Sequence, residues 1–355
     1  MSKTLSRNFT EGNIWRQLIL FSLPFMASNA LQVFYSTIDM IIVGHFVGTA
    51  GLSAVSQSSQ IVNFATMLCF GFSNAGQVLV AQAFGAKKTR EANDIVGTLT
   101  VFVLSFSLVI AAIVLVFRNA ILSAINIPAE SEAMAVDYLV ICISGLIFTA
   151  GYNLVSAVLR GMGDAKSPFL FIGIASFVNL ALDLLFTGAL GWGVAGAAWA
   201  TIIGQAVSFI FSLFYLYKRR AFFGFDFKPE SFIPRRKYVG MIATLGTPMA
   251  IQSGFINISM LFVNAMINDI GVVESATYGV GVRIDDIINK ISLGVQYAAI
   301  PMISQNIGAG NRERAKSVVY RTWALSLGLT AVFMVIYALF GRELFMLFSD
   351  DPLVH

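Results

Sequence analysis

Long apolar stretches alternate with short charged segments along the whole chain. An α-helix rises 1.5 Å per residue and the hydrocarbon core of a bilayer is about 30 Å thick, so about 20 apolar residues suffice for one crossing. The uncharged stretch 40–86 would form a helix of about 70 Å, too long for one crossing, and must turn near residues 45–51. The stretch 184–217 breaks in the same way at 188–193. The pattern predicts nine helical spans, at about 17–43, 52–82, 95–117, 138–159, 167–187, 194–217, 238–267, 276–307 and 322–341.

The composition excludes a water-soluble protein. Of the 355 residues, 57% are hydrophobic and only 12% are charged, whereas soluble domains have roughly 25% charged residues. The chain is therefore predicted to be an all-α polytopic membrane protein that lies in a lipid bilayer.

The basic residues predict the orientation. Most of the 23 Lys and Arg residues fall in the N-terminal tail and in alternate loops, around 3–16, 87–90, 160–166, 218–237 and 312–321. Short cytoplasmic loops accumulate Lys and Arg, so we predict a multi-pass protein of the cell membrane with a cytoplasmic N-terminus. This topology explains the net charge of +4. We therefore predict no nucleic-acid partner.

The chain resembles itself at a period near 224 residues. Pro24 pairs with Pro248, and the segment that begins at Gly71 pairs with the one that begins at Gly294. Six spans separate the copies, which makes the two repeats parallel, as in the halves of some secondary transporters. We therefore predict an N-lobe of six helices at 1–217, a basic cytoplasmic linker at 218–237 and a partial C-lobe of three helices at 238–355. Three further spans would complete this second lobe, so the chain holds about nine of twelve spans.

Carboxylates inside predicted spans are the candidate functional groups. A charged side chain at the bilayer centre costs roughly 2.5–3.5 kcal/mol, so one that is kept there is a functional candidate. Asp39 lies late in the first span and Asp183 in the fifth, where Asn179 is on the same helix face. Thr201 in the sixth span could add a hydroxyl group. Two carboxylates in a dry site could bind a proton or coordinate a small cation; the alternative is that both are hydrated at the outer interface.

A second polar group lies in the eighth span. It consists of Arg283, Asp285, Asp286 and Lys290, whose charges sum to zero, and Asp286 and Lys290 have the spacing of an ion pair on one helix face. A structural ion network is favoured over a direct role in the passage of substrate or ions.

Signatures of catalysis are missing from the sequence. It has no G-x-x-x-x-G-K-[ST] phosphate loop and no H-E-x-x-H zinc motif, and it contains only two histidines. Residues 161–164 fit the G-x-G-D pattern of intramembrane aspartyl proteases but fall in a short basic loop. We therefore predict no catalytic residues and no metal site.

Several motifs resemble the multidrug and toxic compound extrusion (MATE) family of secondary transporters. These are Asn13-Ile14 leading to Pro24, Thr37-Ile38-Asp39-Met40-Ile41-Ile42-Val43-Gly44, Gln82-Ala83-Phe84-Gly85-Ala86, Leu159-Arg160-Gly161-Met162-Gly163-Asp164-Ala165, Asn179-Leu180-Ala181-Leu182-Asp183 and the run Gly191–Thr201. The resemblance implies two helical lobes around a central cavity and a monomer that exports small lipophilic cations by alternating access. Export would be driven by Na⁺ or H⁺ without another cofactor, and the cation-coupling site would be Asp39, Asn179, Asp183 and Thr201.

Two other functions remain open at this stage. A lipid-linked oligosaccharide flippase of the same superfamily would share the fold but usually has basic residues in its cavity, and the first six predicted spans contain none. An intramembrane enzyme would need an acid/base pair or a metal motif, which the sequence does not offer.

Overall fold

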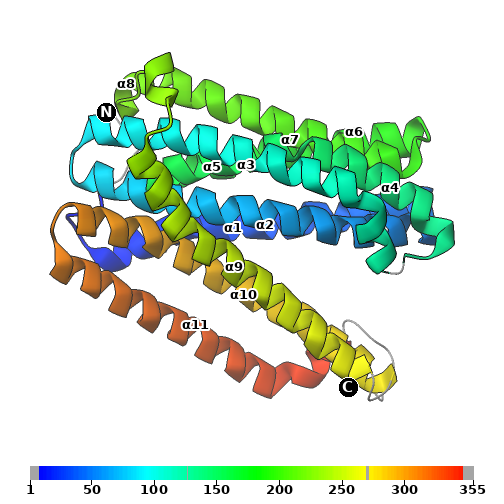
Figure 1. The fold of residues 1–355 in the computed structure, drawn as a ribbon. Helices are drawn as coiled ribbons and strands as arrows, with labels where there is room; N and C mark the ends of the chain where they lie inside the picture. The colour runs from blue at the N-terminus through cyan, green and yellow to red at the C-terminus, as the bar shows by residue number, and fades with distance from the viewer. Residues whose placement is uncertain (1–7, 126, 269–271, 347–355) are drawn as a thin grey trace.

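The structure, a computed structural model, describes residues 8–125, 127–268 and 272–346. This part of the chain is helical and contains no strand. The first seven long helices form one bundle (Figure 1): α1 (Ile14–Phe46), α2 (Thr49–Gly85), α3 (Thr89–Ala124), α4 (Ala129–Ser144), α5 (Leu146–Gly161), α6 (Lys166–Asp183) and α7 (Gly193–Lys218). A π-helical turn, η1 (Leu184–Ala189), continues α6.

The remaining elements form the linker and a second group of helices. The linker contains the short helix α8 (Arg220–Phe223) and the 3₁₀ turn η2 (Pro229–Phe232). It leads to α9 (Arg236–Asn268), α10 (Val272–Gly308) and α11 (Arg312–Met346). These three helices diverge from the bundle towards the end where α9 ends and α10 begins (Figure 1).

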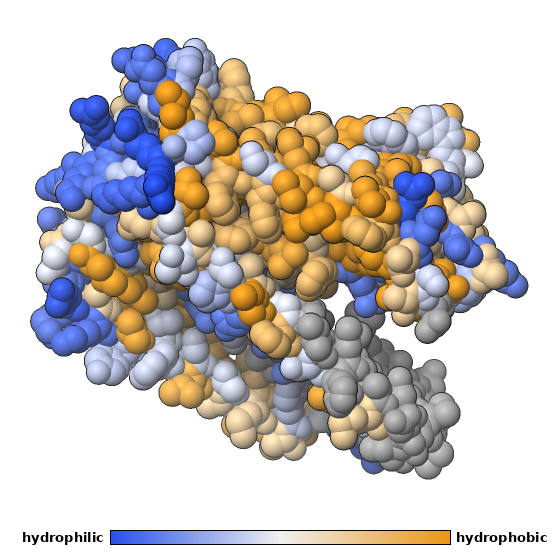
Figure 2. Space-filling model, viewed as in Figure 1, coloured by the Kyte–Doolittle hydropathy of each residue, from blue (hydrophilic) through white to orange (hydrophobic). Residues whose placement is uncertain are grey.

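The helices fit the predicted spans. Seven described helices are long and apolar enough to cross a membrane, or eight if the bent pair α4 and α5 counts as one span. The eighth predicted span corresponds to α10, which is long enough to cross but carries charged residues. Figure 2 shows hydrophilic side chains gathered at both ends of the molecule and an apolar band between them. The prediction of an all-α polytopic membrane protein is confirmed.

The fourth predicted span, 138–159, is broken in the structure. Gly145 separates α4 from α5, and the two helices meet at an angle of 44°. A Cβ atom at Gly145 would overlap the side chain of Ile202 on α7. The glycine therefore allows α7 to pack closely against the break, a tertiary requirement that hydropathy does not detect.

The two repeats pack against each other reciprocally at one end of the molecule. A Cβ atom on Gly85 of α2 would overlap the main-chain oxygen of Gln305, and one on Gly308 of α10 would overlap that of Gln82. The internal repeat pairs Gly85 with Gly308 and Gln82 with Gln305, so each contact is the repeat equivalent of the other. This relation, in which i contacts j as j contacts i, is that of a two-fold axis. The parallel repeat is thus visible in the packing.

We call this end of the molecule the basic end; it carries the loops 86–88, 162–165 and 309–311. The N-terminal segment 8–13 also lies there and connects the two groups of helices. Phe9 N–H donates to Gln305 Oε1 (3.0 Å) and Phe9 O accepts from Asn306 Nδ2 (3.1 Å). Arg314 at the start of α11 donates from Nε to Phe9 O (2.9 Å) and from Nη2 to Gly12 O (2.8 Å). The basic end is therefore held closed by main-chain contacts and by this segment.

Candidate functional site

The two predicted carboxylates meet between α1 and α6. Asp183 is the last residue of α6 and is completely buried, and Asp39 on α1 is half-buried. Their carboxyl groups are close enough to interact electrostatically. Two ionised carboxyl groups this close repel each other strongly away from water. A proton or a small cation between them would relieve this repulsion.

Neutral polar groups complete the predicted set. Asn179 lies one turn before Asp183 with its amide beside that carboxyl group. Its Nδ2 atom is 3.5 Å from Oγ1 of Thr201 on α7. The structure thus brings together all four residues of the predicted cation-coupling site, from three helices.

Three carboxyl oxygens of this cluster accept no hydrogen bond from the described residues. Asp39 Oδ1 and both oxygens of Asp183 are buried, and no donor among the described residues reaches them with hydrogen-bonding geometry. Buried polar atoms are almost always paired. Oxygens without a donor are the ligands that hard cations prefer, and they equally accept a proton. Their role in coupling stays a prediction.

Two tyrosines extend the cluster and were missed by the sequence analysis. Tyr35 lies one turn before Asp39 on α1, and Tyr138 on α4 also lies within electrostatic range of Asp39. The hydroxyl group of Ser59 on α2 donates to that of Tyr138 (3.3 Å). The i,i+4 spacing from Asp39 could have found Tyr35. Nothing in the sequence points to Tyr138, because only the packing of α4 on α2 and α7 brings it within electrostatic range of Asp39.

Close packing of α7 on α6 sets the geometry of the site. A Cβ atom at Gly204 would lie 3.0 Å from Ala175 O and 3.1 Å from Asn179 Cβ. One at Gly196 would lie 2.9 Å from the main-chain carbon of Phe186, in the π-helical turn that follows Asp183. Such turns are rare in helices and frequent at functional sites. The two glycines let α7 approach this turn and hold Asn179 opposite Thr201.

The second polar group is described only in part. The side chains of Arg283 and Asp286 lie outside the described residues, and with them the predicted pair of Asp286 with Lys290. Asp285 is exposed and accepts from Asn289 Nδ2 (2.6 Å). The main-chain oxygen of Lys290 accepts from Asn29 Nδ2 on α1 (3.0 Å), which ties α10 to the bundle. The ion network stays a prediction.

The prediction that the first six spans contain no basic residue is wrong for Arg160. The charge pattern predicts a loop at 160–166, but Arg160 lies in the last turn of α5 and is half-buried. Its Nε donates to Gln77 Oε1 (3.2 Å), and its guanidinium group lies 5.7 Å from the centre of the Phe25 ring. The first lobe therefore does contain a basic side chain away from the loops, because α5 extends beyond the uncharged stretch.

The fold and these side chains define an α-helical membrane transporter: parallel repeats, broken helices and polar groups buried within the spans are the marks of that class. Comparison with known proteins gives the family. The MatE family model matches residues 24–185 and 248–355, and the chain belongs to this family of MATE transporters. The predicted resemblance is confirmed, as is the prediction that the protein is not an enzyme.

Relatives and solved structures agree with this assignment. The chain is 31% identical to the probable multidrug resistance protein YpnP of Bacillus subtilis, over 97% of this chain and 77% of that protein. It is 26% identical to the probable multidrug resistance protein NorM of Thermotoga maritima, over 96% of this chain and 73% of that protein. A crystal structure of a MATE transporter in the bent conformation superimposes with a TM-score of 0.91 at 22% identity, over 98% of this chain and 77% of that one. An outward-facing MATE family transporter gives a TM-score of 0.90 at 22% identity, over 99% and 77%.

Proposed function

We propose that this protein exports lipophilic organic cations from the cell and couples their export to the inward movement of Na⁺ or H⁺. The observation that carries the proposal is the completely buried carboxyl group of Asp183, which faces Asp39 with oxygens that lack donors. A buried carboxyl group costs free energy in the folded protein unless it binds a proton or a cation. The names of the relatives, multidrug resistance proteins, support export of drugs as the physiological activity.

In the proposed cycle, binding of the coupling ion and of the substrate changes the relative stability of two conformations that open to opposite sides. The basic end is closed here by Gly85, Gly308 and the N-terminal segment, whereas α9 and α10 diverge from the bundle at the other end. With the basic loops in the cytoplasm, this conformation opens outwards. Export as a monomer is consistent with a site built from helices of one chain.

Two alternatives from the sequence are less well supported. A flippase for a lipid-linked diphosphate needs several basic groups facing the cavity, and in the described part of the first lobe Arg160 is held by a neutral side chain and an aromatic ring. An intramembrane enzyme has no support from the relatives, which are transporters.

Transport in proteoliposomes tests the proposal. A fluorescent organic cation is loaded or added outside, and Na⁺ and H⁺ gradients are imposed separately. We expect one gradient to drive cation movement at several times the rate seen without a gradient, with protein-free liposomes as the control. Movement that responds to neither gradient would contradict coupled export.

Orientation is tested independently with reporter fusions. We expect a reporter fused after Lys88, or within residues 226–237, to be cytoplasmic, and one fused after Gly188 to be external. The physical reason is the retention of Lys and Arg in short cytoplasmic loops. Alkaline phosphatase and green fluorescent protein fusions report opposite sides, and the reverse pattern would refute the outward-open assignment.

A further inference from the structure

The linker between the two groups of helices lies flat on the outer surface of α3. Asn93 Nδ2 donates to Gly224 O (2.9 Å), and Arg235 forms an ion pair with Asp94 (3.1 Å). A Cβ atom at Gly97 would overlap the main-chain oxygen of Ser231, so only glycine allows the linker to lie this close to α3. These contacts fix the linker at the basic end, where the bundle meets the polar surface (Figure 2).

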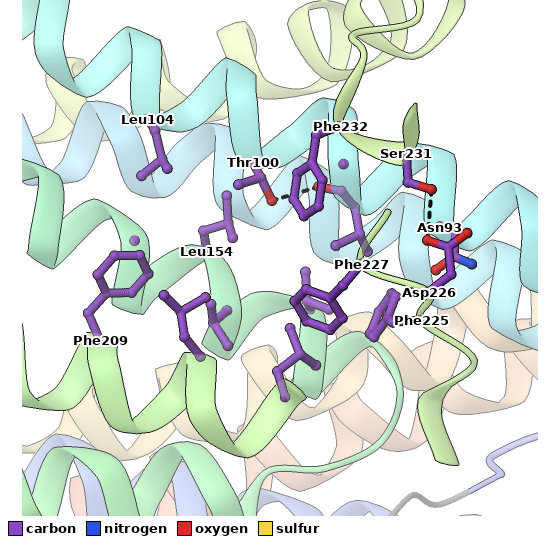
Figure 3. Close-up of a pocket in the computed structure, with 17 residues that line it drawn as sticks. Asn93, Thr100, Leu104, Leu154, Phe209, Phe225, Asp226, Phe227, Ser231 and Phe232 are labelled. Carbon is purple, nitrogen blue, oxygen red and sulfur yellow. Dashed lines mark hydrogen bonds between the residues drawn. The ribbon is translucent and has the colours of Figure 1, made fainter. Parts of the chain in front are cut away.

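An apolar groove runs beneath the linker. Phe227 and Phe232 of the linker line it together with Leu104, Leu154 and Phe209, which come from α3, α5 and α7 (Figure 3). The groove has a volume of about 60 Å³, room for about four water-sized groups. Its lining is almost wholly apolar, so a short run of methylene groups suits it better than water does. It is partly open to the outside.

Arg220 adjoins the groove through two aromatic rings, and Lys218 precedes it at the end of α7. The Phe227 ring packs edge-on against Tyr217 (centres 5.5 Å apart), and the Arg220 guanidinium group lies 4.5 Å from the centre of the Tyr217 ring. The ammonium group of Lys218 lies 5.9 Å from the centre of the exposed Phe214 ring. Within the described residues, neither Arg220 nor Lys218 has a carboxylate within ion-pairing distance. Both charges are therefore available to an anion at the membrane surface.

One negatively charged side chain, Asp226, also lines the groove. It lines the groove at the end where Asn93 and Ser231 lie (Figure 3). Hydrogen bonds from the Ser231 hydroxyl (2.8 Å) and from the Lys228 main-chain N–H (3.2 Å) keep its pKa below the usual value, so it is ionised. Because Asp226 accepts hydrogen bonds from the linker and is negatively charged, a further negative group fits better on the Tyr217 side of the groove.

We propose that this groove is a binding site for an anionic phospholipid, with a short part of one acyl chain against Phe227 and Phe232 and the phosphate near Arg220 and Lys218. Tyrosine and basic residues commonly occupy the headgroup level of a bilayer. Basic residues at the cytoplasmic surface attract anionic lipids, and here the attraction is combined with a groove for the chain. Bound lipid would tie the linker to the N-lobe, and the site is separate from the carboxyl pair.

Lipid titration of the purified protein tests the site. Dioleoyl phosphatidylglycerol and dioleoyl phosphatidylcholine are each added to the protein in detergent, and bound lipid is counted by native mass spectrometry. We expect phosphatidylglycerol to bind more tightly, and the preference to fall about fivefold for each charge removed in Arg220→Gln and Lys218→Gln. Raising the salt concentration should weaken the preference in the wild type. Arg118→Gln, an exposed charge on α3 at least 20 Å along the helix from the groove, is the matched control and should leave it unchanged.

A second variant tests the chain-binding part. Leu154→Phe reduces the groove and should lower the binding of both lipids while leaving the preference between them. The melting temperature of this variant in lipid-free detergent shows whether its fold is intact. The test with Arg220→Gln does not depend on this variant. Equal binding of the two lipids by the wild type, or an unchanged preference in the Arg220→Gln, Lys218→Gln protein, would overturn the proposal. So would displacement of phosphatidylglycerol by uncharged detergent at equal concentration.

Discussion

Transport by the Asp39→Asn, Asp183→Asn protein is expected to lose its response to the ion gradient. Asparagine keeps the shape of each side chain but removes its charge, so the cluster can no longer exchange a proton or hold a cation between two carboxylates. We expect gradient-driven transport to fall at least about tenfold, to the level without a gradient, while the organic cation still binds. Because the two acids act on one ion, each single replacement should cost nearly as much as both together.

The measurement is uptake of a fluorescent cation into proteoliposomes under the coupling gradient, with substrate binding followed separately by fluorescence anisotropy. Asp137→Asn is the matched control, since Asp137 is an exposed carboxylate on α4 beside Tyr138. It should retain full coupling. Intact gradient-driven transport in the double variant would show that the pair does not couple, and attention would then move to the segment from Arg283 to Lys290.

The second large effect is expected at the reciprocal contact of the repeats. Gly85→Ala and Gly308→Ala each place a methyl group against a main-chain oxygen of the opposite helix, Gln305 or Gln82. A backbone cannot move aside as a flexible side chain does, and overpacking of this kind costs about 1–3 kcal/mol. Both variants should therefore weaken the closure of the basic end, and by similar amounts, since the repeat makes the two positions equivalent.

Two measurements check this prediction. The melting temperature in detergent should fall by several degrees, and a cysteine introduced near the contact should become more reactive towards a water-soluble maleimide. Gly240→Ala in α9 and Gly328→Ala in α11 are the controls, since a Cβ atom at either position meets no atom within 4 Å. These two should be neutral or slightly stabilising, because alanine favours helix over glycine by up to about 1 kcal/mol. A difference of more than twofold between the two contact variants would argue against a symmetric contact.

The positions of the helices were largely predictable. Crossing a bilayer requires about 20 apolar residues in one helix, a constraint that acts on each segment by itself and is therefore written in the local sequence. The break at Gly145 was not predicted, because both halves of the span are equally apolar and the break serves the packing of Ile202. Arg160 was misplaced for a related reason: an uncharged stretch marks where a span is apolar, while α5 continues two residues beyond it, to Gly161.

The candidate site was partly predictable as well. Asp39 and Asp183 were conspicuous because charges are costly within apolar helices, and the i,i+4 rule joined Asn179 to Asp183. Tyr138 has no such signal, since a neutral residue does not stand out in an apolar span, and only the packing of α4 on α2 and α7 brings it within electrostatic range of Asp39.

The sequence by itself determined the class of protein, its helices, its internal repeat and the acids that interrupt its apolar segments. The helices and the cost of the acids follow from the free energy of transferring each residue from water to lipid, and the repeat from comparing two segments of the sequence. Only the tertiary structure decided that Asp39 and Asp183 face each other, that Gly85 and Gly308 close the basic end and that the linker covers a groove on α3. Those features depend on contacts between residues far apart in the chain, and such contacts are fixed by how whole helices pack, which no local pattern encodes.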